Sequence, residues 1–495
     1  MTSLINNLRQ KAESQPDAPF IIFGSETITY RKFLSLINEY SKYLRNRNIR
    51  PGQFVGVFQK NNPEFILAYY SLVNCSAVPV LFQPTLSTNK LTYLVNKIKI
   101  ETVIYHPDFQ KIIDEVELKK GSPFNKINLN NLNALPETNQ SADKSAPSGV
   151  SESTISPTAP FTILFTSGYS GYNRTVVHSE QGFIHNAEKC RHLLPVRNPS
   201  RILSTFPLYQ YPAVSFFTHT LVMTGSTIVL FSNPQIDEIS RTIKDNKVNV
   251  LITTPDFGQR LMANEKSDTA LLVCLITGDR YADEVLSKTC NGLNIEITQF
   301  YGTTETLVTL INRRRVEVDL TATGQPFPSD ELRLVNEQGA PVRTGQVGEL
   351  QVRGGSAMLG YFDELFHPHH FHSDWVRTDD LFSKDADDSF YLVGKKCDFI
   401  RRYGYFINPL DIEKVLRESS KIKDVVAVPV HQTEYNDAIK ICIIPADDAQ
   451  LSTDEMMNIC QSRLPRFLTP EIVEFYNHFE RDQSGKILRN LLNKN

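Results

Sequence analysis

The stretch that decides the fold is FTILFTSGYSGYNRTVVHSE, residues 161–180. It begins with an apolar run that is typical of a buried β-strand, and it continues into hydroxyl residues and glycines with one cation, Arg174, at the exit. Glycines allow the main chain to approach a bound group closely, so that backbone N–H groups and hydroxyls can face an anion. The loop lacks the spacing of a Walker A motif. By itself it leaves a phosphate site and an ordinary turn both open.

Short runs rich in valine and isoleucine alternate with helix-length segments on both sides of this stretch. Residues 29–48 place Phe33, Ile37, Tyr40 and Leu44 on one helical face. The expected buried strands are FVGVF (54–58), AVPVLF (77–82), TVIYH (102–106), STIVLF (226–231), VNVLITTP (248–255), LLVCLITG (271–278) and IEITQFYG (295–302). Strands that alternate with helices predict an α/β fold of stacked, layered parallel sheets that helices cover on both faces.

The pattern changes after residue 330. Residues 330–354 alternate polar and apolar side chains between glycine turns, which predicts a small antiparallel β unit. NPLDIEKVLRE (408–418) then starts a helix, with Asn408 as its cap and Pro409 at its first position. A βαβ-type string follows. We therefore expect a large N-terminal domain over 1–395 and a small, mobile α+β domain over 398–495, with a hinge near 394–398. A Ser- and Pro-rich surface linker is expected over 135–160.

Composition excludes several classes of protein. The formal net charge of −3 shows no basic footprint for nucleic acid. The seven cysteines are scattered and form no CxxC, which argues against a disulfide framework or a zinc site. The N-terminus carries acids without a long apolar core, and no stretch reaches the roughly 18 apolar residues of a membrane span. The sequence predicts a cytoplasmic protein.

Three further stretches carry residues that suit nucleotide chemistry. QFYGTTET (299–306) is expected to leave a strand at Phe300, at the carboxyl edge where open α/β sheets bind ligands. A tyrosine can stack on a base, a threonine can reach a phosphate, and a glutamate can hold Mg²⁺; a polar turn before a helix stays equally open. The other two are residues 375–413, from WVRTDD to NPLDIE, and SGKILR (484–489).

In this order the four stretches resemble those of the adenylate-forming superfamily, which includes acyl- and aryl-CoA synthetases, firefly luciferase and the adenylation domains of peptide synthetases. TSGYSGYNRT stands for the usual T-S-G-[ST]-T-G-x-P-K-G, and WVRTDD stands for W-x-x-T-G-D. GKKCDFIRRYGYFINPLDIE follows the usual G-R-x-x-D-x-I-K-x-x-G pattern, while YGTTE and SGKILR are intact. The resemblance covers essentially the whole chain.

The resemblance implies a nucleotide site. The residues expected to surround the β- and γ-phosphates are Thr166, Ser167, Gly168, Ser170, Gly171 and the cation Arg174. Those expected to form the adenine pocket are Gly278, Asp279 and Arg280 on one wall, with Tyr301 and Gly302 on the other. Asp380 would accept the ribose hydroxyls, with Lys395 in place of the usual arginine.

The resemblance also implies the reaction. A carboxylate attacks the α-phosphorus of ATP to form an acyl-adenylate and pyrophosphate, and a pantetheine thiol of CoA or of an acyl carrier protein then displaces AMP. Because two anions must meet, cations are needed. Thr304 would contact the α-phosphate, Glu305 would hold Mg²⁺, and Lys486 would bridge the carboxylate and the phosphate. Asp398 would be the hinge, and Gly404 would lie in the loop that forms the thiol channel.

The acid pocket is expected from Tyr209, Gln210, Tyr211, Pro212 and Thr306. Pro212 stands where peptide-synthetase adenylation domains pair an aspartate with the substrate amino group, so an α-amino acid is disfavoured. Gln210 stands where coumarate-type ligases often have histidine. The aromatic side chains favour an aromatic acid, and an aliphatic acid of short or medium length stays open.

Three departures from the family pattern touch the nucleotide site. Pro-Lys-Gly has become Asn173-Arg174-Thr175, the glycine of T-G-D has become Asp379, and the arginine of G-R has become Lys395. Since Glu305, Asp380 and Lys486 are present, we expect an active enzyme. The alternative is a catalytically impaired relative that binds nucleotide or acyl-adenylate as a sensor or scaffold. The clusters FHPHHFH (366–372) and NRRRVEV (312–318) are interpreted as solvent-facing loops.

Overall fold

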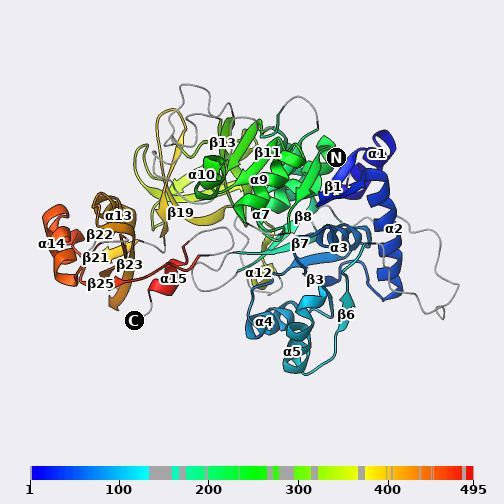
Figure 1. The fold of residues 1–495 in the computed structure, drawn as a ribbon, viewed down its shortest axis with the longest axis horizontal. Helices are drawn as coiled ribbons and strands as arrows, with labels where there is room; N and C mark the ends of the chain where they lie inside the picture. Colours follow the sequence, from blue (N-terminus) through cyan, green and yellow to red (C-terminus); the bar gives the residue numbers. More distant parts are fainter. Residues whose placement is uncertain are drawn as a thin grey trace.

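The computed structural model describes residues 3–132, 156, 159–166, 174–195, 199–232, 235–264, 271–277, 295–313, 322–365, 374–396, 399–402, 405–433, 436–446, 449, 451–481 and 487–493. In this part of the chain an α/β body carries a small antiparallel sheet and is followed by a separate group of C-terminal elements (Figure 1). The predicted fold class is confirmed. The expected linker at 135–160 lies almost wholly outside the described residues.

Four of the expected strands, β10 to β13, lie in a nine-stranded sheet with the order β15-β14-β13-β12-β11-β9-β10-β1-β2. From β1 to β13 all neighbours are parallel, and both edges add antiparallel strands. Strands β10, β11 and β12 are buried along their whole length, which accounts for their continuous apolar runs. The strands are β1 (Pro19–Phe23), β2 (Glu26–Thr29), β9 (Arg201–Ser204), β10 (Thr227–Leu230), β11 (Val250–Thr253), β12 (Val273–Ile276), β13 (Glu296–Thr303), β14 (Leu307–Arg313) and β15 (Gln325–Pro326).

The opening stretch belongs to a second, seven-stranded sheet with the order β18-β8-β7-β4-β3-β5-β6. Its strands are β3 (Phe54–Phe58), β4 (Val78–Leu81), β5 (Thr102–Tyr105), β6 (Asn125–Asn128), β7 (Pro160–Phe165), β8 (Thr175–Ser179) and β18 (Gly360–Tyr361). β7 and β8 pair antiparallel, so the expected phosphate loop connects two neighbouring strands. Residues 167–173 of that loop lie outside the described residues.

Helices cover the sheets, and α3 links them. The hydroxyls of Tyr69 and of Thr162 on β7 lie 2.8 Å apart, and the ring of Tyr70 lies 5.8 Å from the ring of Phe20 on β1. The α-helices that precede the C-terminal elements are α1 (Leu4–Ser14), α2 (Tyr30–Asn46), α3 (Pro63–Asn74), α4 (Thr88–Ile98), α5 (Gln110–Lys120), α6 (Glu180–Arg191), α7 (Tyr211–Ser215), α8 (Leu221–Thr224), α9 (Ile236–Asp245), α10 (Pro255–Asn264) and α12 (Phe362–Leu365). A 3₁₀ turn spans Pro107–Phe109 and a π turn spans Phe216–Thr220; a second 3₁₀ turn, Arg466–Leu468, belongs to the C-terminal elements. Within the described residues none of the helices is long and apolar enough to cross a membrane.

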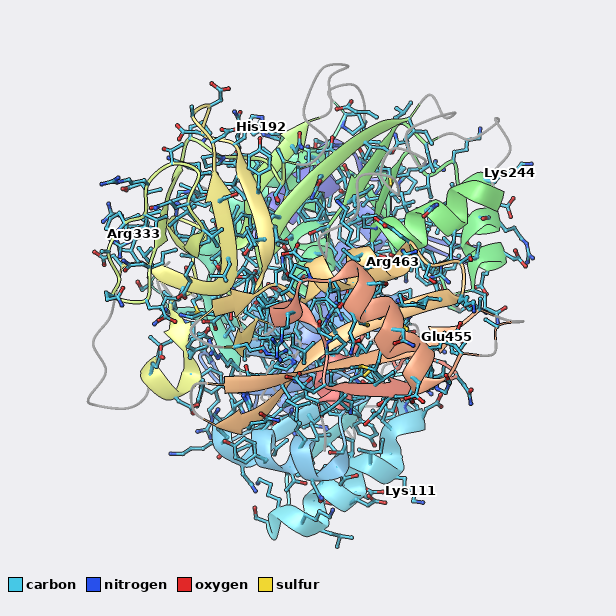
Figure 2. The ribbon with its side chains drawn as sticks, turned by 90° about the vertical axis from the view of Figure 1, so that its left-hand side faces the viewer. Lys111, His192, Lys244, Arg333, Glu455 and Arg463 are labelled. Carbon is cyan, nitrogen blue, oxygen red and sulfur yellow. The ribbon has the colours of Figure 1, made fainter. Side chains whose placement is uncertain are left out.

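The expected antiparallel unit is a four-stranded sheet with the order β16-β17-β19-β20. It consists of β16 (Asp330–Val335), β17 (Gly348–Gly354), β19 (Val376–Lys384) and β20 (Phe390–Lys395). Figure 2 places Arg333 on this sheet, and it shows Glu455 and Arg463 on helix α14 of the C-terminal elements.

The C-terminal elements form their own apolar core from residues between Ile400 and Leu492. They are β21 (Ile400–Arg402), β22 (Tyr405–Ile407), α13 (Pro409–Arg417), β23 (Ile422–Thr433), β24 (Asn436–Pro445), α14 (Thr453–Arg463), β25 (Ile472–Phe475) and α15 (Arg489–Leu492). β23 and β24 form an antiparallel hairpin, and β25 joins β24 in parallel after α14. Asn408 caps α13 as expected, since its side chain accepts from the N–H of Leu410. The domain boundaries stay a prediction.

Candidate nucleotide and acid site

Asp380 is the centre of a hydrogen-bonded group on the four-stranded sheet. It lies on β19 directly opposite Lys395 of β20, and the Lys395 ammonium donates to Asp380 Oδ1 at 2.8 Å. Tyr301, at the end of β13, donates its hydroxyl to Asp380 Oδ2 at 2.7 Å. Burial raises the pKa of Tyr301 well above its ordinary value, so the hydroxyl stays a donor. Each carboxylate oxygen keeps a further lone pair that can accept a ribose hydroxyl.

The ring of Tyr301 packs against the ring of Phe382 on β19. Its ring lies 4.9 Å from the ring of Phe382 in an edge-to-face arrangement, and only 6% of the residue is exposed. The residues expected on the opposite adenine wall, Gly278, Asp279 and Arg280, lie outside the described residues.

The YGTTE segment contains the last residues of β13 and the start of a hairpin turn, so the strand does not end at Phe300. β13 continues to Thr303 because it pairs antiparallel with β14, and no helix follows Glu305. The prediction of a strand end at Phe300 and the alternative of a helix start were therefore wrong. Gly302 is required by close approach, since a Cβ there would lie 1.9 Å from the carbonyl oxygen of Leu307. Thr303 and Thr306 tie the turn together through their hydroxyls at 3.2 Å.

Thr304 is positioned by His178, a residue that the motifs did not indicate. His178 lies on β8 and is fully buried, and its Nε2 is 2.7 Å from the carbonyl oxygen of Thr304. A carbonyl can only accept, so Nε2 carries the proton and donates. Burial lowers the pKa of His178 to about 4, which keeps the ring neutral at ordinary pH. The available sequence signal was a single ionisable residue, His178, in the buried run TVVHS.

This burial predicts a pH-dependent stability. The folded state holds His178 neutral, so its contribution is fully present above about pH 6.5 and is lost as the pH falls toward 4, a change of about 3 kcal/mol. His178→Asn should therefore flatten the slope of the free energy of unfolding between these pH values, measured by urea denaturation. The exposed His192 supplies the control, and equal slopes in His178→Asn and His192→Asn would contradict the prediction.

Glu305 is the residue best suited to a divalent cation. It is 8% exposed, and the hydroxyl of Tyr361 donates to its Oε1 at 2.9 Å. Burial raises the pKa of Glu305, because the ionised carboxylate is less stable away from water, and a bound cation would stabilise the ionised form. A buried carboxylate with a neutral donor fits Mg²⁺, which prefers oxygen ligands. Tyr361, on β18, was not indicated by any local pattern.

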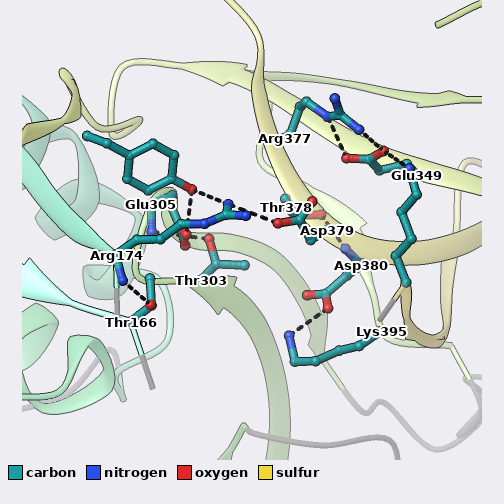
Figure 3. A network of polar contacts seen from close by, with 12 residues as sticks. Thr166, Arg174, Thr303, Glu305, Glu349, Arg377, Thr378, Asp379, Asp380 and Lys395 are labelled. Atoms are coloured by element: carbon teal, nitrogen blue, oxygen red, sulfur yellow. Dashed lines mark hydrogen bonds and ion pairs between the residues drawn. The ribbon is translucent and has the colours of Figure 1, made fainter. Parts of the chain in front are cut away.

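The exit of the phosphate loop meets the same residues (Figure 3). The backbone N–H of Arg174 donates to Thr166 Oγ1 at 2.9 Å, and the N–H of Thr166 donates to the Arg174 carbonyl at 3.1 Å. Arg174 Nη1 donates to the hydroxyl of Tyr361 at 2.9 Å. The structure thus brings Thr166, Arg174 and Glu305 together. Ser167, Gly168, Ser170 and Gly171 lie outside the described residues.

The expected acid-pocket residues divide by exposure. Tyr209, Pro212 and Thr306 are buried in packing, whereas Gln210 and Tyr211 are partly exposed. The Tyr211 hydroxyl lies 3.3 Å from Thr277 Oγ1. Burial raises the pKa of Tyr211 to about 12, and the charges of Asp380, Lys395 and Glu305 also act on it. Tyr211 therefore lies close to the residues expected to bind the nucleotide, and its role in an acid pocket stays a prediction.

The C-terminal motifs meet through one buried ion pair. Arg489 of SGKILR donates to Glu413 of NPLDIE, with Nη1 at 2.6 Å from Oε1 and Nη2 at 3.1 Å from Oε2. This pair anchors the chain three residues after Lys486. Lys486 itself, the expected hinge Asp398 and the expected channel residue Gly404 lie outside the described residues.

The family model described as AMP-binding enzyme matches residues 8–362, well over half of the chain. The chain belongs to the AMP-binding enzyme family. The resemblance to adenylate-forming enzymes is thereby confirmed.

Similar members of the AMP-binding enzyme family match along nearly the whole chain. The 2-succinylbenzoate–CoA ligase of Bacillus pumilus (strain SAFR-032) is 24% identical, over 98% of this chain and 97% of that protein. The indoleacetate–CoA ligase of Aromatoleum aromaticum (strain DSM 19018 / LMG 30748 / EbN1) is 22% identical, over 96% and 94%. Among solved structures, O-succinylbenzoate coenzyme A synthetase from Bacillus subtilis with ATP and magnesium ion has a TM-score of 0.84 at 20% identity, covering 99% of both chains. That likeness establishes the shared fold.

Proposed function

We propose that this AMP-binding enzyme is an acid–thiol ligase that uses ATP to adenylate a carboxylic acid, and then transfers the acyl group to a pantetheine thiol. The observation that carries the proposal is the group around Asp380, whose carboxylate is held by Tyr301 and Lys395. Glu305 and Arg174 reach the same site through Tyr361. This combination provides a ribose acceptor, a metal ligand and a phosphate cation in one place.

Each polar or charged residue of the site has its own role in the proposed reaction. Asp380 fixes the ribose, and Arg174 with the phosphate loop holds the β- and γ-phosphates. Thr304, whose carbonyl is fixed by His178, presents its hydroxyl to the α-phosphate. A magnesium ion at Glu305 would neutralise phosphate charge as the acid carboxylate attacks the α-phosphorus. Lys486 approaches from the C-terminal side and neutralises the reacting carboxylate, and pyrophosphate leaves. The thiol then displaces AMP after the small domain rotates about Asp398, which brings the loop around Gly404 to the site.

The proposed substrate is an aromatic acid that is not an α-amino acid. Tyr211 is partly exposed, and the charges of Asp380, Lys395 and Glu305 act on it; Gln210 next to it is also partly exposed. Pro212 has no charge to pair with a substrate amino group. Two similar proteins are named for acids that contain an aromatic ring, 2-succinylbenzoate and indoleacetate. Their names also support CoA as the acceptor, and a carrier protein is the alternative. A cytoplasmic location stays a prediction.

The test is ATP–pyrophosphate exchange across benzoates, arylacetates, cinnamates, aliphatic acids and amino acids. We expect exchange with the aromatic acids, and Lys486→Ala should abolish it. Adding CoA or a phosphopantetheinylated carrier protein to the accepted acid should then identify the acceptor by the thioester formed. Exchange with amino acids alone would overturn the substrate assignment.

One observation favours the second candidate, a relative that binds nucleotide without turnover. Arg174 is already paired with the Asp379 carboxylate at 2.9 Å, so the phosphate-loop cation is partly neutralised. ATP binding without exchange for any acid would establish this candidate and overturn the ligase.

A further inference from the structure

Two of the three departures from the family pattern contact each other. Arg174 replaces the family lysine at the exit of the phosphate loop, and Asp379 replaces the family glycine next to the ribose carboxylate. They are 205 residues apart in the chain, yet Arg174 Nη1 lies 2.9 Å from Asp379 Oδ2 (Figure 3). Asp379 adds a negative charge, and Arg174 keeps the positive charge of the family lysine and pairs with it, so the two form one feature of this chain.

Arg174 is held at three points. Its backbone closes the base of the phosphate loop against Thr166. Its guanidinium lies 5.2 Å from the centre of the Tyr361 ring, and Nη1 serves both the Tyr361 hydroxyl and the Asp379 carboxylate. Both hydrogen bonds of the guanidinium to these two residues come from Nη1, so the group can turn toward another anion while the backbone contacts with Thr166 stay in place. The side chain is 46% exposed, which leaves it accessible to a ligand.

Asp379 occupies a backbone position that favours glycine. Its φ is +57°, in the left-handed region that most side chains avoid and that aspartate tolerates better than most. The carboxylate therefore stands at a site where the backbone alone would select glycine. It lies beside Asp380, which adds negative charge next to the expected position of the triphosphate.

The pair is weak enough to be displaced. With side chains 46% and 43% exposed, it resembles surface ion pairs, which contribute about 0.2–1 kcal/mol. A triphosphate with bound Mg²⁺ offers Arg174 several charged oxygens in the same region, and a guanidinium binds phosphate oxygens with two nitrogens at once.

We propose that Asp379 competes with the β- and γ-phosphates of ATP for Arg174, so that the Arg174–Asp379 pair sets how strongly the site prefers ATP over AMP. The inference rests on the proposed function, because it takes ATP as the ligand. Without nucleotide, Asp379 holds the Arg174 guanidinium next to β19, the strand that carries Asp380. When ATP binds, Arg174 leaves Asp379 and turns to the phosphates. AMP has no β- or γ-phosphate, so its binding leaves the pair intact.

The test compares nucleotide affinities by isothermal titration calorimetry without any acid. Asp379→Asn removes the charge and keeps the size of the side chain and its tolerance of a positive φ. We expect it to bind Mg·ATP on the order of fivefold more tightly than the unaltered protein, the equivalent of about 1 kcal/mol. AMP affinity should be unchanged. Weaker ATP binding by Asp379→Asn would overturn the proposal, since Asp379 would then be positioning Arg174 for the phosphates.

A double-mutant cycle separates competition from simple repulsion. In an Arg174→Gln background, Asp379→Asn should no longer improve ATP binding, because the contested cation is absent. An equal improvement in both backgrounds would overturn the proposal in favour of repulsion between Asp379 and the triphosphate. Glu331→Gln is the control: Glu331 forms a more exposed ion pair with Arg353 on the sheet that carries Asp379, and its loss should leave both affinities unchanged.

The ligase reaction and the competition for Arg174 can be tested independently of each other. If ATP binding responds to Asp379→Asn as expected while no acid supports pyrophosphate exchange, the competition stands and the ligase reaction falls. If exchange occurs and ATP affinity does not respond, the reaction stands and the competition falls.

Discussion

Replacing Glu305 with glutamine is expected to slow ATP–pyrophosphate exchange by on the order of a hundredfold or more. Glutamine keeps the shape of the side chain and can still accept a hydrogen bond from Tyr361, but it carries no charge to hold Mg²⁺. Glu305 is buried, so the neighbouring solvent supplies little compensation. The rate is measured with the preferred acid at saturating ATP, together with the free energy of unfolding. Exchange within about threefold of the unaltered protein would contradict the metal role.

The pH profile gives an independent measure of the same charge. Because burial raises the pKa of Glu305 above its ordinary value of 4.5, the carboxylate takes up its proton at a higher pH than an exposed glutamate does. Exchange should therefore fall on the acid side, and Glu305→Gln should lack this limb in its residual activity. Tyr361→Phe removes only the hydroxyl that donates to Glu305 and is expected to have a smaller effect.

Replacing Arg489 with leucine is expected to destabilise the C-terminal elements by about 3–5 kcal/mol. Glu413 is fully buried, and Arg489 supplies two of its hydrogen bonds while also donating to the carbonyl of Ala427 on β23 at 3.0 Å. Without Arg489 the carboxylate keeps its burial and loses its principal counter-charge. Hydrogen exchange of β23 and β24 measures the effect locally.

Arg417 provides the comparison for Arg489, since it contacts the same carboxylate from a half-exposed position. Its Nη2 lies 3.4 Å from Glu413 Oε2, with 47% of its side chain exposed. Arg417→Leu should therefore cost no more than about 1 kcal/mol. Pyrophosphate exchange should fall sharply in Arg489→Leu alone, because the segment that carries Lys486 loses its anchor. Equal effects of the two substitutions would contradict the assignment.

Local sequence determined much of this protein. Buried strands alternate with amphipathic helices, and the spacing of the apolar residues and the length of each run were enough to indicate an α/β body and the later antiparallel sheet. The cap at Asn408 was readable because it depends on its own neighbours. Asp380 and Glu305 were found through motifs whose spacing the chain retains. Each of these features depends on residues that are close in sequence.

Tertiary structure decided the contacts between distant residues. The extension of β13 to Thr303 follows from pairing with β14, which local propensity does not register. His178 reaches Thr304 across 126 positions, and Tyr361 reaches Arg174 across 187. The sequence showed Arg174 and Asp379 as two separate departures, one in a loop and one on a strand. Only the packing of β8, β18 and β19 brings their charges within hydrogen-bond distance, because Coulomb and hydrogen-bond energies depend on separation in space and not along the chain.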